Sequence, residues 1–199
     1  MTNALIVIDV QESFRQRPNW SAMSRPDIAA RVARLVEHTR DRGEHIVWIL
    51  HTEPGTDNVF DPGMGHVRLL DGLTPRDAEP VLTKTSVNSF TTTNLAQRLT
   101  LWGVDEVTVC GIRTEQCCET TARVASDLGY RVNFVSDATA TTPIEHPQAP
   151  AGRALDAILA DPLTLSAAEI TARTEYILAG RGFATVTTLD EATAAGSAG

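Results

Sequence analysis

The sequence lacks the features that mark membrane, secreted and nucleic-acid-binding proteins. No apolar run is long enough to span a membrane. The N-terminus shows no signal-peptide pattern and enters directly into an apolar, strand-like run. Three cysteines, an odd number, do not form a disulfide framework, so we expect a protein of the reducing cytoplasm. The formal net charge of −8, from 17 basic and 25 acidic side chains, argues against binding to nucleic acid.

Glycine-rich cofactor motifs are also missing from the sequence. There is no P-loop, and Gly63-Met64-Gly65 follows no predicted strand. This short segment also lacks the third glycine of a dinucleotide fingerprint. We therefore expect the protein to work without a cofactor.

Patterns typical of strands and helices alternate along the 199 residues. Apolar runs predict strands at 4–10, at 46–50, at 81–84, from 107 onward, at 132–135 and at 184–187. Helical patterns lie between and after them, at 26–42, 92–102, 117–129, 150–159 and 167–178. The alternation predicts one α/β domain over 1–191, a parallel sheet covered by helices on both faces, followed by a flexible tail at 192–199.

A cysteine follows one of these strands at a distinctive place. The β-branched run that starts at Val107 is broken by Gly111, and Thr114 can cap a helix after it. Cys117 then falls in the first helical turn, where the helix dipole favours the reactive thiolate. A buried structural thiol is the ordinary alternative, and this stretch alone does not decide between the two.

Two charged residues stand at the ends of other predicted strands. Asp9 lies near the end of the first apolar run, and Lys84 ends the third strand. Taken singly, Asp9 could cap a turn and Lys84 could be solvated. Because ligands bind beyond the carboxyl ends of parallel strands, we expect both side chains to meet Cys117 at one edge of the sheet.

Three ordered segments resemble the isochorismatase-like cysteine hydrolases, a superfamily that includes nicotinamidases, carbamoyl amidases and isochorismatases. The segments are Asp9-Val10-Gln11-x-x-Phe14, Lys84 with Asn88-Ser89-Phe90, and Gly111-Ile112-x-Thr114-Glu115-x-Cys117. The resemblance implies a three-layer α/β/α fold with a six-stranded parallel sheet of order 3-2-1-4-5-6. It also implies that Asp9, Lys84 and Cys117 are a catalytic triad.

The same resemblance implies a role for each of these residues. Cys117 attacks an electrophilic carbon, Asp9 shuttles protons, and Lys84 holds Asp9 and stabilises charge. A cis peptide is implied between Ile112 and Arg113, with the backbone amides of Arg113 and Cys117 forming an oxyanion hole. Cys118 occupies a place that is apolar in the family, and we expect it to be a buried structural thiol, as we expect for Cys110.

Substrate contacts and metal binding are less clearly marked. Nicotinamidases bind a metal through an Asp-x-His segment, where this chain has His51-Thr52-Glu53, so we expect no metal. The weakly patterned segment 52–80 is long enough to be functional or mobile. For the aromatic candidates, a place in the substrate pocket and a place in the core are equally expected. The candidate substrate contacts are Phe14, Trp20, His51, Phe60, Asn88 and Phe90.

The sequence therefore predicts a hydrolase of a small amide, carbamoyl or ureido compound. Two alternatives stay open: isochorismatase activity, which can cleave a vinyl ether by acid catalysis without the cysteine, and a non-catalytic binding module on the same fold. The expected partners are a small-molecule substrate and further copies of the chain in a homo-oligomer. We expect no nucleic acid and no membrane among the partners.

Overall fold

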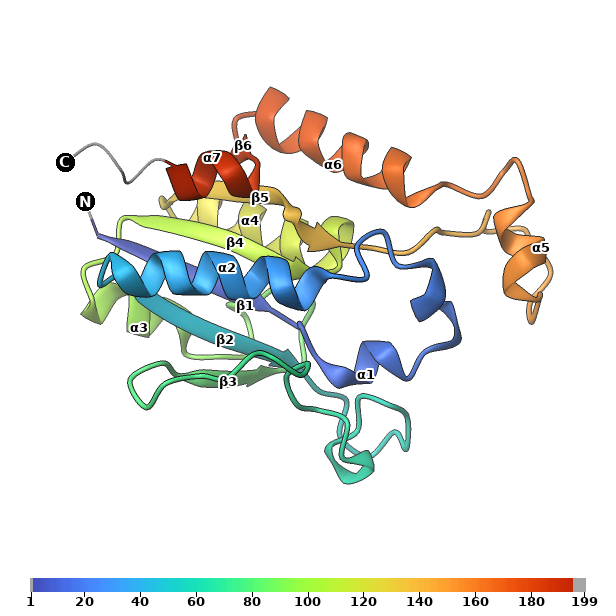
Figure 1. Ribbon diagram of the computed structural model, residues 1–199, viewed down its shortest axis with the longest axis horizontal. Helices are drawn as coiled ribbons and strands as arrows, with labels where there is room; N and C mark the ends of the chain where they lie inside the picture. Colours follow the sequence, from blue (N-terminus) through green and yellow to red (C-terminus); the bar gives the residue numbers. More distant parts are fainter. Residues whose placement is uncertain (1, 195–199) are drawn as a thin grey trace.

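The fold is a parallel sheet between two layers of helices (Figure 1). The computed structural model describes residues 2–194. Six strands pair in the order β3-β2-β1-β4-β5-β6, and every pair is parallel. This order is the one that the sequence resemblance predicts. Within the described residues no helix is both long and apolar enough to cross a membrane.

Strands and helices alternate as the apolar pattern predicts, with additional short elements. The strands are β1 (Asn3–Ile8), β2 (His45–His51), β3 (Val81–Lys84), β4 (Glu106–Ile112), β5 (Arg131–Ala140) and β6 (Thr185–Thr187). The helices are α1 (Glu12–Arg15), α2 (Ile28–Asp41), α3 (Leu95–Leu101), α4 (Glu119–Asp127), α5 (Leu155–Leu159), α6 (Ala167–Gly180) and α7 (Leu189–Ala194).

The central strands are buried on both faces, which explains their continuous apolar sequences. Along β1, Leu5 and Val7 face the core under α2 and α7. Ile6 and Ile8 face the opposite core, which is closed by α3, α4 and α6. Since side chains alternate along a strand, β1 supplies both cores and fixes the middle of the sheet.

Several elements differ from the sequence expectation. The helix expected around Cys117 begins with a π-helical turn, Thr114–Cys118, before α4 starts at Glu119. Thr114 does not cap this turn, because its hydroxyl donates to Thr139 Oγ1 at 2.8 Å. Helix α7 was not predicted and includes residues 192–194, the start of the expected tail. The rest of that tail, 195–199, lies outside the described residues.

The carboxyl ends of the strands lie at one edge of the sheet. Parallel pairing sets Ile8 beside Ile49 and Gly111, and sets His51 beside Lys84. The segment between β2 and β3 forms an irregular lobe at this same edge (Figure 1). The sheet therefore brings the ends of β1, β2, β3 and β4 together, where the sequence places its charged residues.

Candidate functional site

Asp9 lies immediately after β1 in an unusual backbone conformation. Its φ of 54° is one of two positive values among the non-glycine residues described. Its amide donates to the Ile49 carbonyl at 2.9 Å, which keeps it tied to β2. The side chain is fully buried, and neither oxygen has a well-aligned hydrogen-bond donor among the described residues. The charge of this carboxylate is instead balanced by an ion pair.

Lys84 supplies that ion pair and is the only lysine in the chain. Its Nζ lies 2.8 Å from Asp9 Oδ2, and both side chains are completely buried. The ammonium also donates to Cys117 Sγ at 3.4 Å and to the Ser86 carbonyl at 3.2 Å. Lys84 therefore links the carboxylate to the thiol. That the chain has a single lysine, placed at a strand end, is a further sequence signal for this site, and the motif comparison did not use it.

Cys117 reaches Lys84 from the π-helical turn that follows β4. The peptide bond between Ile112 and Arg113 is cis, as the resemblance implies. The Arg113 carbonyl accepts hydrogen bonds from the amides of Gln116 and Cys118, which closes the turn. The Arg113 amide has no acceptor among residues 2–194. Cys117 lines the cavity described below, whereas the adjacent Cys118 is fully buried and packs in the core with α4.

Burial controls the protonation of these three groups. Burial and then the charge of Asp9 raise the pKa of the Cys117 thiol to about 12, while Lys84 acts to lower it. Burial likewise raises the pKa of the Asp9 carboxyl, although Lys84 opposes the shift. Burial acts to lower the pKa of Lys84, but the charges of Asp9 and Cys117 outweigh it and raise that pKa.

The resting thiol is therefore protonated, with the Asp9 carboxyl group and the Lys84 ammonium as neighbours. The direction of the Cys117 pKa shift is opposite to the expected preference for a thiolate, because burial and the charge of Asp9 outweigh the effect of Lys84. The sequence does not show how deeply Cys117 is buried.

A cavity of about 360 Å³ opens onto Asp9 and Cys117. This volume lies at the small end of the range of ligand pockets. Its walls come from the α1 segment, the end of β2, the lobe and the turn after β4. The lining residues are Asp9, Phe14, Arg17, His51, Glu53, Phe60, Thr85, Val87, Gln116 and Cys117.

Three of the predicted substrate contacts line this cavity, and three do not. The rings of Phe14 and Phe60 pack edge to face, with their centres 5.1 Å apart, and the His51 ring lies edge-on to Phe60. Trp20 instead packs against the core under α2. Phe90 is buried in the opposite core and stacks on Tyr130. Asn88 closes its own loop, since its Oδ1 accepts from the amides of Phe90 and Thr91.

His51 is engaged through both ring nitrogens. Its Nδ1 lies 3.4 Å from Lys84 Nζ, and its Nε2 lies 3.1 Å from Glu53 Oε1. An ammonium can only donate, so Nδ1 accepts and Nε2 carries the proton that is shared with Glu53. No group of three or more potential metal-ligating side chains occurs in the described part of the chain.

Gln11 has a structural role that the motif did not reveal. Its Oε1 accepts from the His51 amide at 2.7 Å, and its Nε2 donates to the His51 carbonyl at 3.0 Å.

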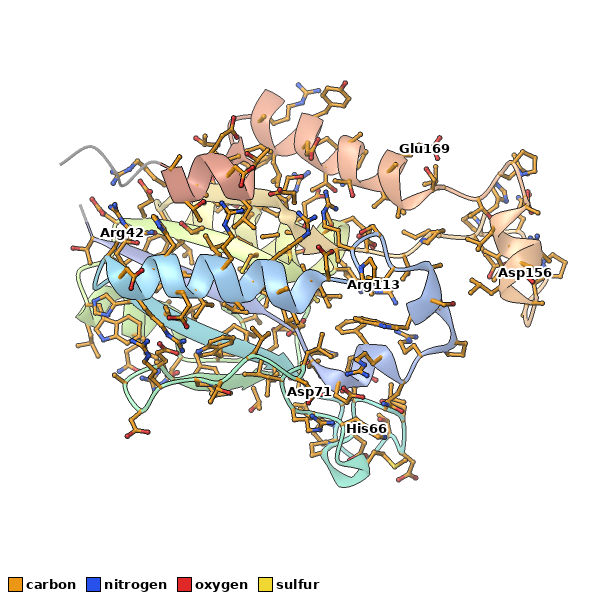
Figure 2. All side chains as sticks on the ribbon, in the orientation of Figure 1. Arg42, His66, Asp71, Arg113, Asp156 and Glu169 are labelled. Carbon is orange, nitrogen blue, oxygen red and sulfur yellow. The ribbon has the colours of Figure 1, made fainter. Side chains whose placement is uncertain are left out.

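The side chains of Arg17 and Arg113 were also not identified from the sequence as part of the site. Their guanidinium groups lie over the rings of Phe60 and Phe14. Figure 2 labels Arg113 at the edge of the molecule where the strands terminate.

A larger hollow, of about 1110 Å³, lies at the opposite end of the sheet near the start of β1 and β4. It is lined there by Asn3, Glu106 and Arg131 among others. Arg131 pairs with Asp105 and Glu106, and no cysteine or lysine borders the hollow. The smaller cavity, with a thiol, a carboxylate and an ammonium behind it, is the one equipped for covalent chemistry.

The chain is similar to several known proteins in sequence and in structure. The isochorismatase domain model matches residues 3–167. An uncharacterized isochorismatase family protein of Bacillus subtilis is 36% identical over 148 residues, covering 73% of this chain and 81% of that protein. Nicotinamidase 3 of Arabidopsis thaliana is 32% identical over 158 residues, covering 69% and 73% respectively. The crystal structure of an isochorismatase from Pseudomonas putida has a TM-score of 0.80 and 29% identity, covering 95% of this chain and 89% of that one.

Proposed function

The chain belongs to the isochorismatase family of hydrolases, and from this premise we propose that it cleaves a small amide, carbamoyl or ureido compound by cysteine catalysis. The observation that carries the proposal is Lys84, whose buried ammonium contacts both Asp9 and Cys117 behind a small cavity. Similarity to a nicotinamidase, by its name an amidase, supports C–N bond cleavage. Asp9, Lys84 and Cys117 form the proposed triad.

The proposed reaction begins with a proton transfer from the Cys117 thiol to Asp9. Asp9 takes the thiol proton as Cys117 Sγ bonds to the substrate carbonyl carbon, so thiolate forms only as it attacks. The backbone amides of Arg113 and Cys117 are the proposed donors to the oxyanion. Asp9 then gives its proton to the leaving nitrogen as the C–N bond breaks, which leaves a thioester.

Water completes the cycle at the same groups. Asp9 takes a proton from water while the hydroxyl oxygen attacks the thioester carbon. The C–S bond breaks, the acid product leaves, and the proton returns from Asp9 to the Cys117 sulfur. Lys84 keeps its proton throughout and balances the negative charge that moves between its two neighbours.

The two adjacent thiols provide the test of this proposal. We expect Cys117→Ala to lose hydrolysis of small amides and ureides by at least about 10³-fold, because the covalent step is removed. Cys118→Ala keeps most of the activity, since that thiol is buried away from the cavity. Steady-state kinetics on a panel of small amides measures both. Equal losses in two variants of unchanged circular dichroism would contradict the role of Cys117.

Vinyl-ether cleavage is the second candidate, and the raised pKa of Asp9 favours it. A carboxyl group that retains its proton can act as a general acid without any thiol. The same variants distinguish the two reactions. If Cys117→Ala still hydrolyses isochorismate while Asp9→Asn does not, acid catalysis is the function of the site.

We also propose that the protein is a cytoplasmic homo-oligomer. All three cysteines are free and buried, which suits a reducing compartment. The segment 141–166 extends away from the sheet (Figure 1), and Ile144, Leu163 and Leu165 are exposed on it. A second copy of the chain would cover these side chains. Sedimentation equilibrium tests this, and a mass equal to one chain of 21.5 kDa would contradict it.

A further inference from the structure

Two arginines beside the cavity have aromatic partners but no acidic ones. The Arg17 guanidinium lies 5.7 Å from the centre of the Phe60 ring, and that of Arg113 lies 5.6 Å from the centre of the Phe14 ring. Arg17, Phe14 and Phe60 line the cavity, and Arg113 reaches this wall by lying over the Phe14 ring, whose centre is 5.1 Å from that of Phe60. Neither forms an ion pair or a side-chain hydrogen bond with any residue in 2–194.

This lack of acidic partners is local. Arg15, two residues before Arg17, pairs with Glu12 and Asp71. Arg123, on α4 beyond the Cys117 turn, pairs with Glu119 at 2.8 Å and also stacks on Phe183. Stacking on a ring therefore does not prevent an arginine of this protein from holding a carboxylate.

Nearby carboxylates form no ion pair with either arginine, although Glu53 and Glu115 act on them electrostatically. Glu53 lines the cavity, but its oxygens accept from Asn58 Nδ2 at 2.6 Å and from His51 Nε2 at 3.1 Å. Asp9 pairs with Lys84. Glu115 lies close enough to act on the pKa of Arg113 but forms no ion pair with it. Arg113 is half-buried, so its charge is partly desolvated, and no carboxylate pairs with it directly.

A guanidinium stacked on a ring still presents its N–H groups at its rim. Those groups can donate in pairs to a planar carboxylate, which is the geometry that arginine recognises best. Arg17 and Arg113 also act on one another electrostatically, so both charges favour the same anion. The wall is thus positive in a protein whose net charge is −8.

We propose that Arg17 and Arg113 bind a carboxylate of the substrate, which makes the substrate class small amido or ureido acids. This inference rests on the proposed function, because it places the reactive carbonyl at Cys117 and the acid group at the stacked arginines. The two arginines act as specificity-determining residues. A neutral amide of the same size would leave both charges without a partner.

A matched pair of alkylating reagents tests the anion site without knowledge of the substrate. Iodoacetate and iodoacetamide differ mainly in charge, and Cys117 is the cysteine that borders the cavity. Mass spectrometry measures the rate at Cys117 with each reagent, normalised to glutathione. We expect a preference for iodoacetate of about tenfold, as one charge-assisted hydrogen bond would give. Arg17→Gln and Arg113→Gln should each remove most of it.

A binding measurement keeps the test independent of thiol reactivity and of catalysis. Calorimetry on Cys117→Ala compares succinamate with its methyl ester, and we expect the acid to bind at least about tenfold more tightly. Arg17→Gln is the variant of choice if Arg113→Gln fails to fold, since Arg17 is exposed. Arg98→Gln is the matched control, because the Arg98 side chain, on α3, donates to Asn94 and pairs with no acidic group among the described residues.

The outcomes separate this inference from the proposed function. A preference for the anion that both arginine variants lose supports the site, even if the wild type hydrolyses no amide. Amide hydrolysis that is equal for acids and esters, with no anion preference in either measurement, overturns the site and leaves the cysteine hydrolase standing. A preference that survives in both variants also overturns the assignment.

Discussion

At the scale of single residues, the buried pair of Asp9 and Lys84 is the most costly feature of the molecule. Two charges are removed from water, and their mutual attraction at 2.8 Å only partly offsets the desolvation. Further contacts from Lys84 to His51, Ser86 and Cys117 give its ammonium additional hydrogen-bond acceptors. A purely structural core would be served as well by apolar side chains, so the pair indicates chemistry.

Removing one partner should cost far more stability than removing both. We expect Lys84→Met to lose about 3–5 kcal/mol of unfolding free energy, because Asp9 is left buried without its cation. The double variant Asp9→Asn/Lys84→Met should regain most of this loss and remain inactive. Urea unfolding of the four proteins in the cycle measures the coupling. A double variant as unstable as the sum of the single ones would show that the two charges do not interact.

The sequence was enough to predict that Asp9, Lys84 and Cys117 come together, but it was not enough to predict their protonation. Asp9, Lys84 and Cys117 stand at predicted strand ends and in recognisable motifs, so their meeting follows from the parallel topology. The raised pKa of Cys117 depends on how completely the turn and the lobe exclude water. Arg17 was missed because it stands in an irregular segment, where no pattern shows which way a side chain points.

At the scale of elements, Gly111 sets the contact between β4 and β1. Its φ is +131°, and a Cβ added there would lie 1.9 Å from the Ile8 carbonyl oxygen. The register of β4 against β5 also shifts between Val109 and Gly111. Only glycine allows β4 to pass this close to the strand that carries Asp9. The Cys117 turn starts three residues later, at Thr114, so this contact helps to fix the distance between Asp9 and Cys117.

We therefore expect Gly111→Ala to destabilise the protein by more than about 3 kcal/mol, since backbone must move to admit the methyl group. Gly103→Ala is the control. Gly103 also has positive φ, at +65°, but nothing lies within 4 Å of an added Cβ. That variant should lose only about 1 kcal/mol, the strain of the left-handed conformation. Chemical unfolding compares them, and equal losses would show that the close approach to Ile8 is unimportant.

The elements themselves were predictable where apolar periodicity is strong. The interiors of β1, β2 and β4 are buried on both faces, and the sequence marks each of them with a continuous apolar run. The π-helical turn at Cys117 was not predictable, because its bonds run from backbone to backbone and leave no side-chain signature. Helix α7 is too short for periodicity to reveal, and its burial rests mainly on Leu189.

At the scale of the whole molecule, three buried thiols make the folded state less stable at alkaline pH. Burial raises the pKa of Cys110, Cys117 and Cys118 above the ordinary value of about 9. Between that value and the folded pKa, the unfolded chain releases thiol protons while the folded chain keeps them. Unfolding is then favoured as pH rises. Lys84 acts in the same direction above its own ordinary pKa, since the folded state holds its proton more tightly.

We expect the unfolding free energy to fall above pH 9 by about 1.4 kcal/mol per pH unit for each buried thiol. Cys110→Ala, which removes a thiol inside β4, should lower this slope by the contribution of one group. Urea titrations of wild type and variant between pH 8 and 11 measure the difference. Parallel curves for the two proteins would contradict a buried, protonated Cys110.

The solitary, enclosed lysine has one more consequence, for proteolysis. An endoproteinase that cleaves after lysine has a single target bond in the whole chain, between Lys84 and Thr85. The Lys84 side chain, which such an enzyme has to bind, is fully buried in the native state. Cutting therefore waits until the molecule opens at β3, and it yields two pieces, residues 1–84 and 85–199. Their rate of appearance on a gel measures how often the chain around Lys84 opens.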